Sequence, residues 1–266
     1  MINKKNLLGA VILMLSLFLS SCQKTDIVEV NNEPPLAIDY EENSPVKELP
    51  DPSLKNGVET TTDKIEVVIP SKYELKVLFS QQAPFANWDE LHQEACEEAS
   101  IIMAVKYFNN EPLDETIMEQ EIQKLVKWQE ENGYQVDLTA KETVQVLKNY
   151  FNIEAEISFE VTSDKIKYEI VKGNLVIVPA AGRKLGNPNF KQPGPIYHML
   201  LIKGFNGSEF ITNDPGTRKG NGYKYKYEKL IGAIHDWNHE LASEGMTDEE
   251  IEEGQKVIII VKGSVS

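Results

Sequence analysis

The sequence of 266 residues is poor in three residue types that often define function. It has two cysteines and four histidines, and its 27 basic residues are outnumbered by 42 acidic ones. A framework of several disulfides is therefore excluded, and an ordinary apolar core must supply the stability. The formal net charge of −15 argues against nucleic-acid binding and against electrostatic docking on anionic lipid.

The N-terminal residues 1–21 have the pattern of a secretory signal. A cationic start, MINKK, precedes an apolar run of 15 residues, which is short for a bilayer span. The following stretch LSSC, ending at Cys22, resembles the lipobox of bacterial lipoproteins, whose cysteine is acylated and becomes the mature N-terminus. We expect an extracytoplasmic protein with a lipid anchor on a bacterial membrane; an ordinary cleaved signal and an uncleaved anchor are the alternatives.

Residues 22–63 are predicted to form an acidic linker punctuated by prolines. An ordered N-terminal subdomain is the alternative reading. Loss of residues 1–21 would leave 25 basic and 42 acidic residues, a net charge of −17. The remaining residues 64–266 fit one domain, which we expect to be monomeric.

Helical patterns come first in this domain, and strand patterns dominate afterwards. Helices are predicted over 96–108, 115–131, 139–151, 164–172 and about 227–237. Strands are predicted at KIEVVIP (64–70), LKVLFS (75–80), IEAEISFE (153–160), NLVIVPA (174–180), YHMLLIKGF (197–205), EFITND (209–214) and KVIIIVKG (256–263). This order indicates an α+β fold with an antiparallel sheet.

If Cys22 is lipidated, Cys96 is the only free thiol, and it lies where an apolar helix should begin. A helix N-terminus and a nearby imidazole are the usual means of activating a cysteine nucleophile. His198 is the best candidate base because it heads a strand after a loop rich in proline and glycine. Asp214 ends the next strand, where it could orient the imidazole. Glu97, directly after the thiol, would oppose a thiolate.

The blocks SQQAPFANWDELHQEACEEAS, YHMLLIKGF and ITNDPGT together resemble papain-like cysteine peptidases related to the bacteriocin-processing, double-glycine (C39) peptidases. The resemblance covers about residues 74–262. It implies a papain-like fold with the catalytic cysteine at the start of the central helix. It also implies Cys96 as nucleophile, His198 as general base and acid, and Asp214 as orienting group. An upstream glutamine, Gln82 or alternatively Gln93, would help to form the oxyanion hole.

The choice between Asp214 and Asn213 as the orienting residue depends on the loop between their strand and the strand of His198. A two-residue turn would place Asn213 on the face of His198, because side chains alternate along a strand. An odd-length loop, Asn206–Ser208, would place Asp214 there. We predict the odd-length loop and Asp214.

The sequence thus predicts a thiol hydrolase acting on peptide or peptide-like amide bonds, without a metal or a cofactor. A non-catalytic peptide-binding lipoprotein on the same fold is one alternative. A cell-wall amidase or endopeptidase is another, although such enzymes usually carry a second histidine where this chain has Asp214. His235 and His239 have helical spacing, but no third ligand accompanies them, so a solvent-facing pair is favoured. Basic residues in the loops near the site could favour an acidic substrate, although loop charge ordinarily serves solvation.

Overall fold

The computed structural model describes residues 67–242 and 246–263 of the chain. The predicted leader (1–21) and linker (22–63) lie outside the described residues. The helices of the described part, in chain order, are α1 (Glu90–Gln93), α2 (Cys96–Phe108), α3 (Glu115–Glu131), α4 (Ala140–Asn149), α5 (Ser163–Val171), α6 (Gly182–Leu185), α7 (Tyr227–Ala233), α8 (His239–Ala242) and α9 (Asp248–Ile251). 

One antiparallel sheet forms the centre of this part of the chain. Its strands are β1 (Lys72–Glu74), β2 (Glu154–Ser158), β3 (Leu175–Ala181), β4 (Tyr197–Asn206), β5 (Glu209–Asn213), β6 (Asn221–Lys226) and β7 (Ile258–Lys262). The strand order is β2-β7-β3-β4-β5-β6, and β1 pairs with β4. The predicted combination of helices with an antiparallel sheet is confirmed.

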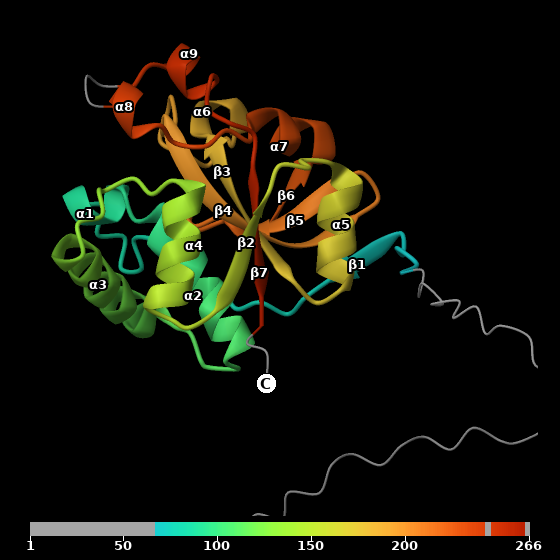
Figure 1. Cartoon of the computed structure of the whole chain (residues 1–266), viewed down its shortest axis with the longest axis horizontal. Coiled ribbons are helices and arrows are strands. Elements are labelled where there is room, and N and C mark those ends of the chain that lie inside the picture. The colour runs from blue at the N-terminus through green and yellow to red at the C-terminus, as the bar shows by residue number, and fades with distance from the viewer. Residues whose placement is uncertain (1–66, 243–245, 264–266) are drawn as a thin grey trace, which may run out of the picture. The chain divides into compact units, whose positions relative to one another are not determined.

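Helices cover both faces of the sheet. All seven residues of β3 are buried, as are nine of the ten residues of β4. Such continuous burial requires packing on both faces, because successive side chains point to opposite sides. Figure 1 shows α1 to α4 on one side of the sheet and α5 with α7 on the other.

The central helix α2 is buried along most of its length, from Cys96 to Val105. Its apolar residues point in nearly all directions, which is typical of a helix enclosed in a core. The structure confirms the predicted bounds of α2 and of α3. Helix α4 is capped by Thr139, the first residue of the helix predicted over 139–151, which forms a capping box with Glu142.

Two strand predictions are wrong, and one strand was not expected. Of the predicted strand 64–70, the described residues 67–70 belong to no strand. Residues 75–80 form no strand; β1 lies just before them, at Lys72–Glu74, and only the N–H of Leu75 continues the pairing with Lys203. Strand β6 was not expected, because NGYKYK is polar and begins next to a glycine. It lies at the end of the sheet, where one side of a strand needs no partner.

The loop between β4 and β5 is shorter than predicted, but Asp214 still lies on the same face of the sheet as His198, as predicted. The turn has two residues, Gly207 and Ser208, instead of three. A β-bulge at Lys203 then shifts the register by one residue. The shift brings Asp214 to the same face as His198, as the odd-length loop would have done.

Candidate active site

The candidate nucleophile Cys96 is the first residue of α2 and is buried, with 5% of its surface exposed. Its backbone N–H has no hydrogen-bond acceptor within residues 67–242 and 246–263, as is usual at the first position of a helix. The positive end of the helix dipole therefore lies at this residue.

The first turn of α2 occupies the place of a strand beside β4. The pairing of β4 with β5 stops at Leu201 and Asn213, so the first residues of β4, including Met199, have no strand partner on the β5 side. There the N–H of Met199 donates to Cys96 Sγ at 3.3 Å, and the carbonyl of Met199 accepts from Ser100 Oγ at 3.2 Å. The thiol is thereby fixed against the residue that follows His198.

His198 and Asp214 form a buried imidazole–carboxylate pair. His198 Nε2 lies 2.8 Å from Asp214 Oδ1, with 2% and 0% of the two side chains exposed. Asp214 Oδ1 also accepts from the N–H of Gly216 at 3.1 Å, and Oδ2 accepts from Asn187 Nδ2 at 3.0 Å and from the hydroxyl of Tyr225 at 2.6 Å. Four donors thus hold the carboxylate of Asp214. The other ring nitrogen of His198, Nδ1, has no hydrogen bond in the part of the chain that the structure describes.

The charge of the carboxylate is maintained by these contacts. Burial alone raises the pKa of Asp214, but the charge of His198 and the hydrogen bonds from His198, Tyr225 and Gly216 outweigh it, so that the pKa lies below its usual value. Asn213 points elsewhere: its Nδ2 donates to the carbonyl of Leu78 at 3.0 Å. The predicted contact is therefore made by Asp214 and not by Asn213.

The position of the imidazole ring is fixed on two further sides. The ring of Phe190 packs edge-on against that of His198, with centroids 5.2 Å apart. A Cβ at Gly216 would lie 2.9 Å from His198 Cε1 and 3.0 Å from Phe190 Cε1, so any side chain there would displace a ring. Glycine is required after Asp-Pro because of this close approach, besides any role in the turn.

The thiol is not bonded to the imidazole. Cys96 Sγ donates to Glu97 Oε2 at 3.1 Å, and no hydrogen bond joins it to His198 within the described ranges. Glu97 is fully buried and its other oxygen accepts from the N–H of Leu138 at 3.4 Å. The structure therefore brings the predicted residues to one end of β4 but holds the sulfur toward Glu97.

This environment disfavours a thiolate in the conformation described. Burial raises the pKa of Cys96 well above its usual value, and the charge of Glu97 together with its hydrogen bond raises it further, against the smaller opposite effect of the Met199 N–H. Burial and the neighbouring carboxylates of Glu98 and Asp137 likewise raise the pKa of Glu97. Activation would require the sulfur to leave Glu97 for a position beside His198.

We expect Glu97→Gln to make the thiol more reactive, because the amide removes a negative charge that raises the pKa of Cys96. If that pKa falls by about one unit, alkylation by iodoacetamide below the midpoint should be about tenfold faster. The measurement is the pH dependence of the alkylation rate, followed by mass spectrometry in a chain that also carries Cys22→Ser. Glu90→Gln is the matched control, since Glu90 is exposed and affects the pKa of neither Cys96 nor Glu97. An unchanged midpoint in Glu97→Gln would contradict the assignment.

Of the two candidate glutamines, Gln82 is the one bonded to the residue after Asp214. Its backbone N–H donates to the carbonyl of Pro215, directly after Asp214, and its Nε2 donates to the carbonyls of His92 and Gln93 at 3.0 Å each. It thus joins the segment before Cys96 to the segment after β5, while its Oε1 is buried without a partner. Gln93 is exposed, and its Nε2 approaches the carbonyls of Trp88 and Asp89 at 3.3 Å.

No group of three histidine, cysteine or acidic side chains is arranged to hold a metal ion in the described part of the chain. The expectation of a solvent-facing histidine pair is wrong, because His235 is buried and bonded to the carbonyl of Gly254 at 3.1 Å. His239 Nε2 instead contacts Glu142 Oε2 at 2.8 Å. The imidazoles of His235 and His239 therefore bind different parts of the chain and do not form a pair.

Sequence reasoning missed Asn187 and Tyr225, the two side chains that hold the far oxygen of Asp214. Asn187 lies in the loop after α6, and Tyr225 lies in β6, the strand that was not expected. The alternation of tyrosines in GYKYKY is the only available signal, and it identifies a strand without identifying a partner.

Comparisons with known proteins identify the family of the chain. The model of the Peptidase_C39 like family matches residues 75–240, a range that contains Gln82, Gln93, Cys96, His198 and Asp214. A crystal structure of a protein from Bacillus anthracis described as a C39-like peptidase aligns with 73% of this chain and 98% of its own, at 16% identity and a TM-score of 0.47. No curated protein matches significantly. The family match spans more than half of the sequence, so the chain belongs to the Peptidase_C39 like family.

Proposed function

We propose that the protein is a thiol hydrolase, a cysteine peptidase that cleaves peptide or peptide-like amide bonds through an acyl-enzyme. The observation that carries the proposal is the buried His198–Asp214 pair. His198 directly precedes Met199, whose N–H donates to the sulfur of Cys96. A carboxylate on Nε2 leaves Nδ1 free to accept a proton, as a general base requires.

In the proposed reaction the sulfur first turns from Glu97 toward His198, and Nδ1 removes its proton. The thiolate attacks the carbonyl carbon of the amide, and the resulting imidazolium gives the proton to the leaving nitrogen as the C–N bond breaks. Water, deprotonated by the same imidazole, then attacks the thioester and releases the acid and the thiol. Asp214 stabilises the imidazolium in both steps.

The oxyanion would be bound by the backbone N–H of Cys96 and the carboxamide of Gln82. The first donor has no acceptor of its own within the described residues. The second donates to two backbone carbonyls, so one of these contacts would be exchanged for the substrate oxygen. Profiling of the intact chain against a peptide library, with Cys96→Ala as the control, tests the proposal and defines the cleaved sequence.

A peptide-binding protein without catalysis is the second candidate. It is favoured by one observation, the raised pKa of a thiol that is hydrogen-bonded to Glu97. A buried thiol of that kind is inert. Binding of peptides without turnover, together with no reaction of Cys96 with electrophiles at neutral pH, would support this candidate over the hydrolase.

The proposal places the catalytic domain outside the cytoplasm as a monomer, on a lipid anchor at Cys22 and the linker that follows. No described helix is both long and apolar enough to cross a membrane. A Cys22→Ser variant should move from the membrane fraction to the soluble fraction, or remain unprocessed, because the acylated sulfur would be missing. Fractionation and the mass of the mature chain are the measurements, and normal processing with unchanged membrane retention would contradict the anchor.

A further inference from the structure

A cavity of about 710 Å³ lies between α1, the first turns of α2, α3 and residues 134–136. Its size is within the range of small-ligand pockets. The acidic residues that line it are Asp89, Glu90, Glu94, Glu98, Glu119 and Glu130. Neither lysine nor arginine lines it, and His92 is its one imidazole.

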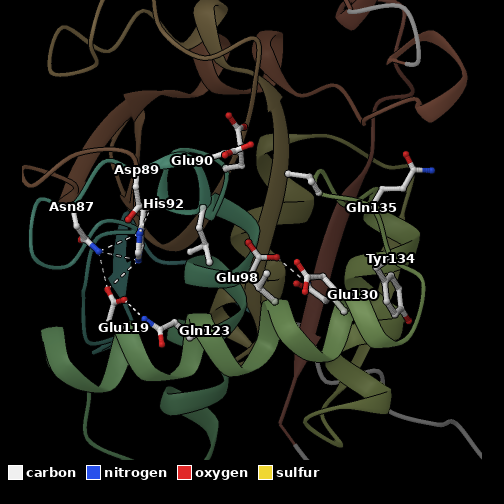
Figure 2. A pocket seen from close by; sticks show the side chains of 15 residues that line it. Asn87, Asp89, Glu90, His92, Glu98, Glu119, Gln123, Glu130, Tyr134 and Gln135 are labelled. Atoms are coloured by element: carbon white, nitrogen blue, oxygen red, sulfur yellow. Dashed lines mark hydrogen bonds and ion pairs between the residues drawn. The ribbon is translucent and has the colours of Figure 1, made fainter. Parts of the chain in front are cut away.

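Only part of this negative charge is balanced by the protein. His92 lies 2.7 Å from Asp89 and 3.0 Å from Glu119, as Figure 2 shows at one end of the cavity. The other four carboxylates, those of Glu90, Glu94, Glu98 and Glu130, make no ion pair with any described residue. The cavity therefore has a surplus of negative charge in a partly enclosed space.

Glu98 is the most deeply buried of these four carboxylates. It is 98% buried, and Gln129 Nε2 donates to its Oε1 at 2.8 Å. Apart from its own backbone N–H, no other described group donates to it. Figure 2 shows Glu98 in the middle of the lining side chains, between Glu90 and helix α3. A buried carboxyl without a counter-charge is costly, and burial raises the pKa of Glu98 to about 7. A cation in the cavity would supply the missing positive counter-charge for Glu98.

The lining also has an apolar side. Leu91, Val126 and Val136 contribute to it, and Val136 is 66% exposed. Lysine and arginine side chains combine an apolar stem with a charged end, so that such a stem could lie on these residues while its end reaches Glu98. A small inorganic cation would make no use of the apolar side.

The cavity lies at the same end of α2 as the candidate nucleophile, although Cys96 itself does not line it. Glu94 and Glu98, which line it, stand two residues before and two residues after Cys96. The basic loop residues that could have favoured an acidic substrate are partly neutralised, since Arg183 pairs with Asp248 at 2.7 Å and Lys184 with Glu252 at 2.8 Å. The lining of the cavity, in contrast, is acidic.

We propose that this cavity is a specificity pocket that receives a lysine or arginine side chain of a peptide bound at Cys96. This inference rests on the proposed hydrolase for its biological meaning, but binding can be measured without hydrolysis. The favoured substrates are then basic peptides and not acidic ones.

The test is calorimetric titration of the intact chain carrying Cys96→Ala with two peptides, acetyl-Ala-Ala-Lys-Ala-Ala-amide and its norleucine counterpart, which lacks only the charge. We expect the lysine peptide to bind at least ten times more tightly. Adding Glu98→Gln should reduce its affinity about tenfold and abolish the preference. Glu253→Gln, which removes an exposed charge outside the cavity, should change neither value.

Because Glu98 is buried, the double variant Glu90→Gln/Glu130→Gln provides a second test at exposed positions. It should also weaken the preference for lysine. Equal binding of the two peptides, no binding of the lysine peptide, or a preference that persists in both variants would overturn the inference. A preference for lysine in a protein that hydrolyses nothing would refute the hydrolase alone, and hydrolysis without that preference would refute the pocket alone.

Discussion

Alanine substitution of Cys96 or of His198 is expected to abolish amide hydrolysis, and the double substitution should cost little more than either single one. Removal of one member of a nucleophile–base pair leaves the other without a function, so the losses are strongly non-additive. We expect kcat/KM to fall at least about 10⁴-fold in each single variant. The measurement is steady-state hydrolysis of the best peptide from the library.

His239→Ala is the matched control for the loss of an imidazole, because His239 contacts Glu142 and not the candidate site. It should retain the activity of the parent chain. If His198→Ala retained most of the activity while Cys96→Ala did not, histidine would have no part in the mechanism. Additive losses in the double variant would show that the two side chains act separately.

Asp214→Ala is expected to reduce kcat/KM by about 10³- to 10⁴-fold, because the imidazole loses both its orientation and the stabilisation of its charged form. The substitution also removes the acceptor of Asn187 and Tyr225. Each buried donor left unpaired costs on the order of 1–3 kcal/mol, so the melting temperature should fall as well. Activity must be measured well below that temperature.

Asn213→Ala separates orientation from stability. Asn213 is as buried as Asp214 and bonds to the carbonyl of Leu78, so its loss should destabilise the fold. It should leave kcat/KM largely unchanged, because it does not contact His198. Asp214→Asn should recover part of the lost activity by keeping an oxygen near the ring. Loss of activity in Asn213→Ala, with activity retained in Asp214→Ala, would reverse the assignment.

The helices were predictable because their signals are local. Helix α2 is apolar on nearly all sides, and α3 carries a stripe at helical spacing closed by Gly133; both bounds agree with the prediction. The capping box at Thr139 is likewise contained in four consecutive residues. Strands β3 and β7 are almost continuous apolar runs, and β4 contains one at 199–202, which is typical of strands covered on both faces.

The parts that were not predicted depend on distant residues. The bulge at Lys203 changes the register of a hairpin whose turn alone would have given the opposite parity, and no local pattern marks it. Strand β6 is defined by its pairing with β5 and not by its polar sequence. The burial of Glu97 was also unexpected, since a charged residue in the first turn of a helix is ordinarily solvated.

The candidate triad could be proposed from the sequence because a helix start, a strand start and a strand end each mark one residue. The orientation of the thiol could not be derived, because it depends on the enclosed carboxyl of Glu97 and on the N–H of Met199, which donates to the sulfur. The cavity is equally non-local, since α1, α2, α3 and residues 134–136 all contribute to it. Spacing along the chain does not show which acids share an enclosed space.

Covalent labelling tests the central claim most directly, because it asks whether Cys96 becomes a nucleophile in the folded chain. The intact protein carrying Cys22→Ser is incubated at neutral pH with a peptide vinyl sulfone whose sequence comes from the library, and its mass is measured. The account predicts a single adduct on Cys96, formed at least a hundred times more slowly in His198→Ala and unaffected in His239→Ala. No adduct, or labelling at the same rate without His198, would contradict a thiol hydrolase and leave a binding protein on the same fold.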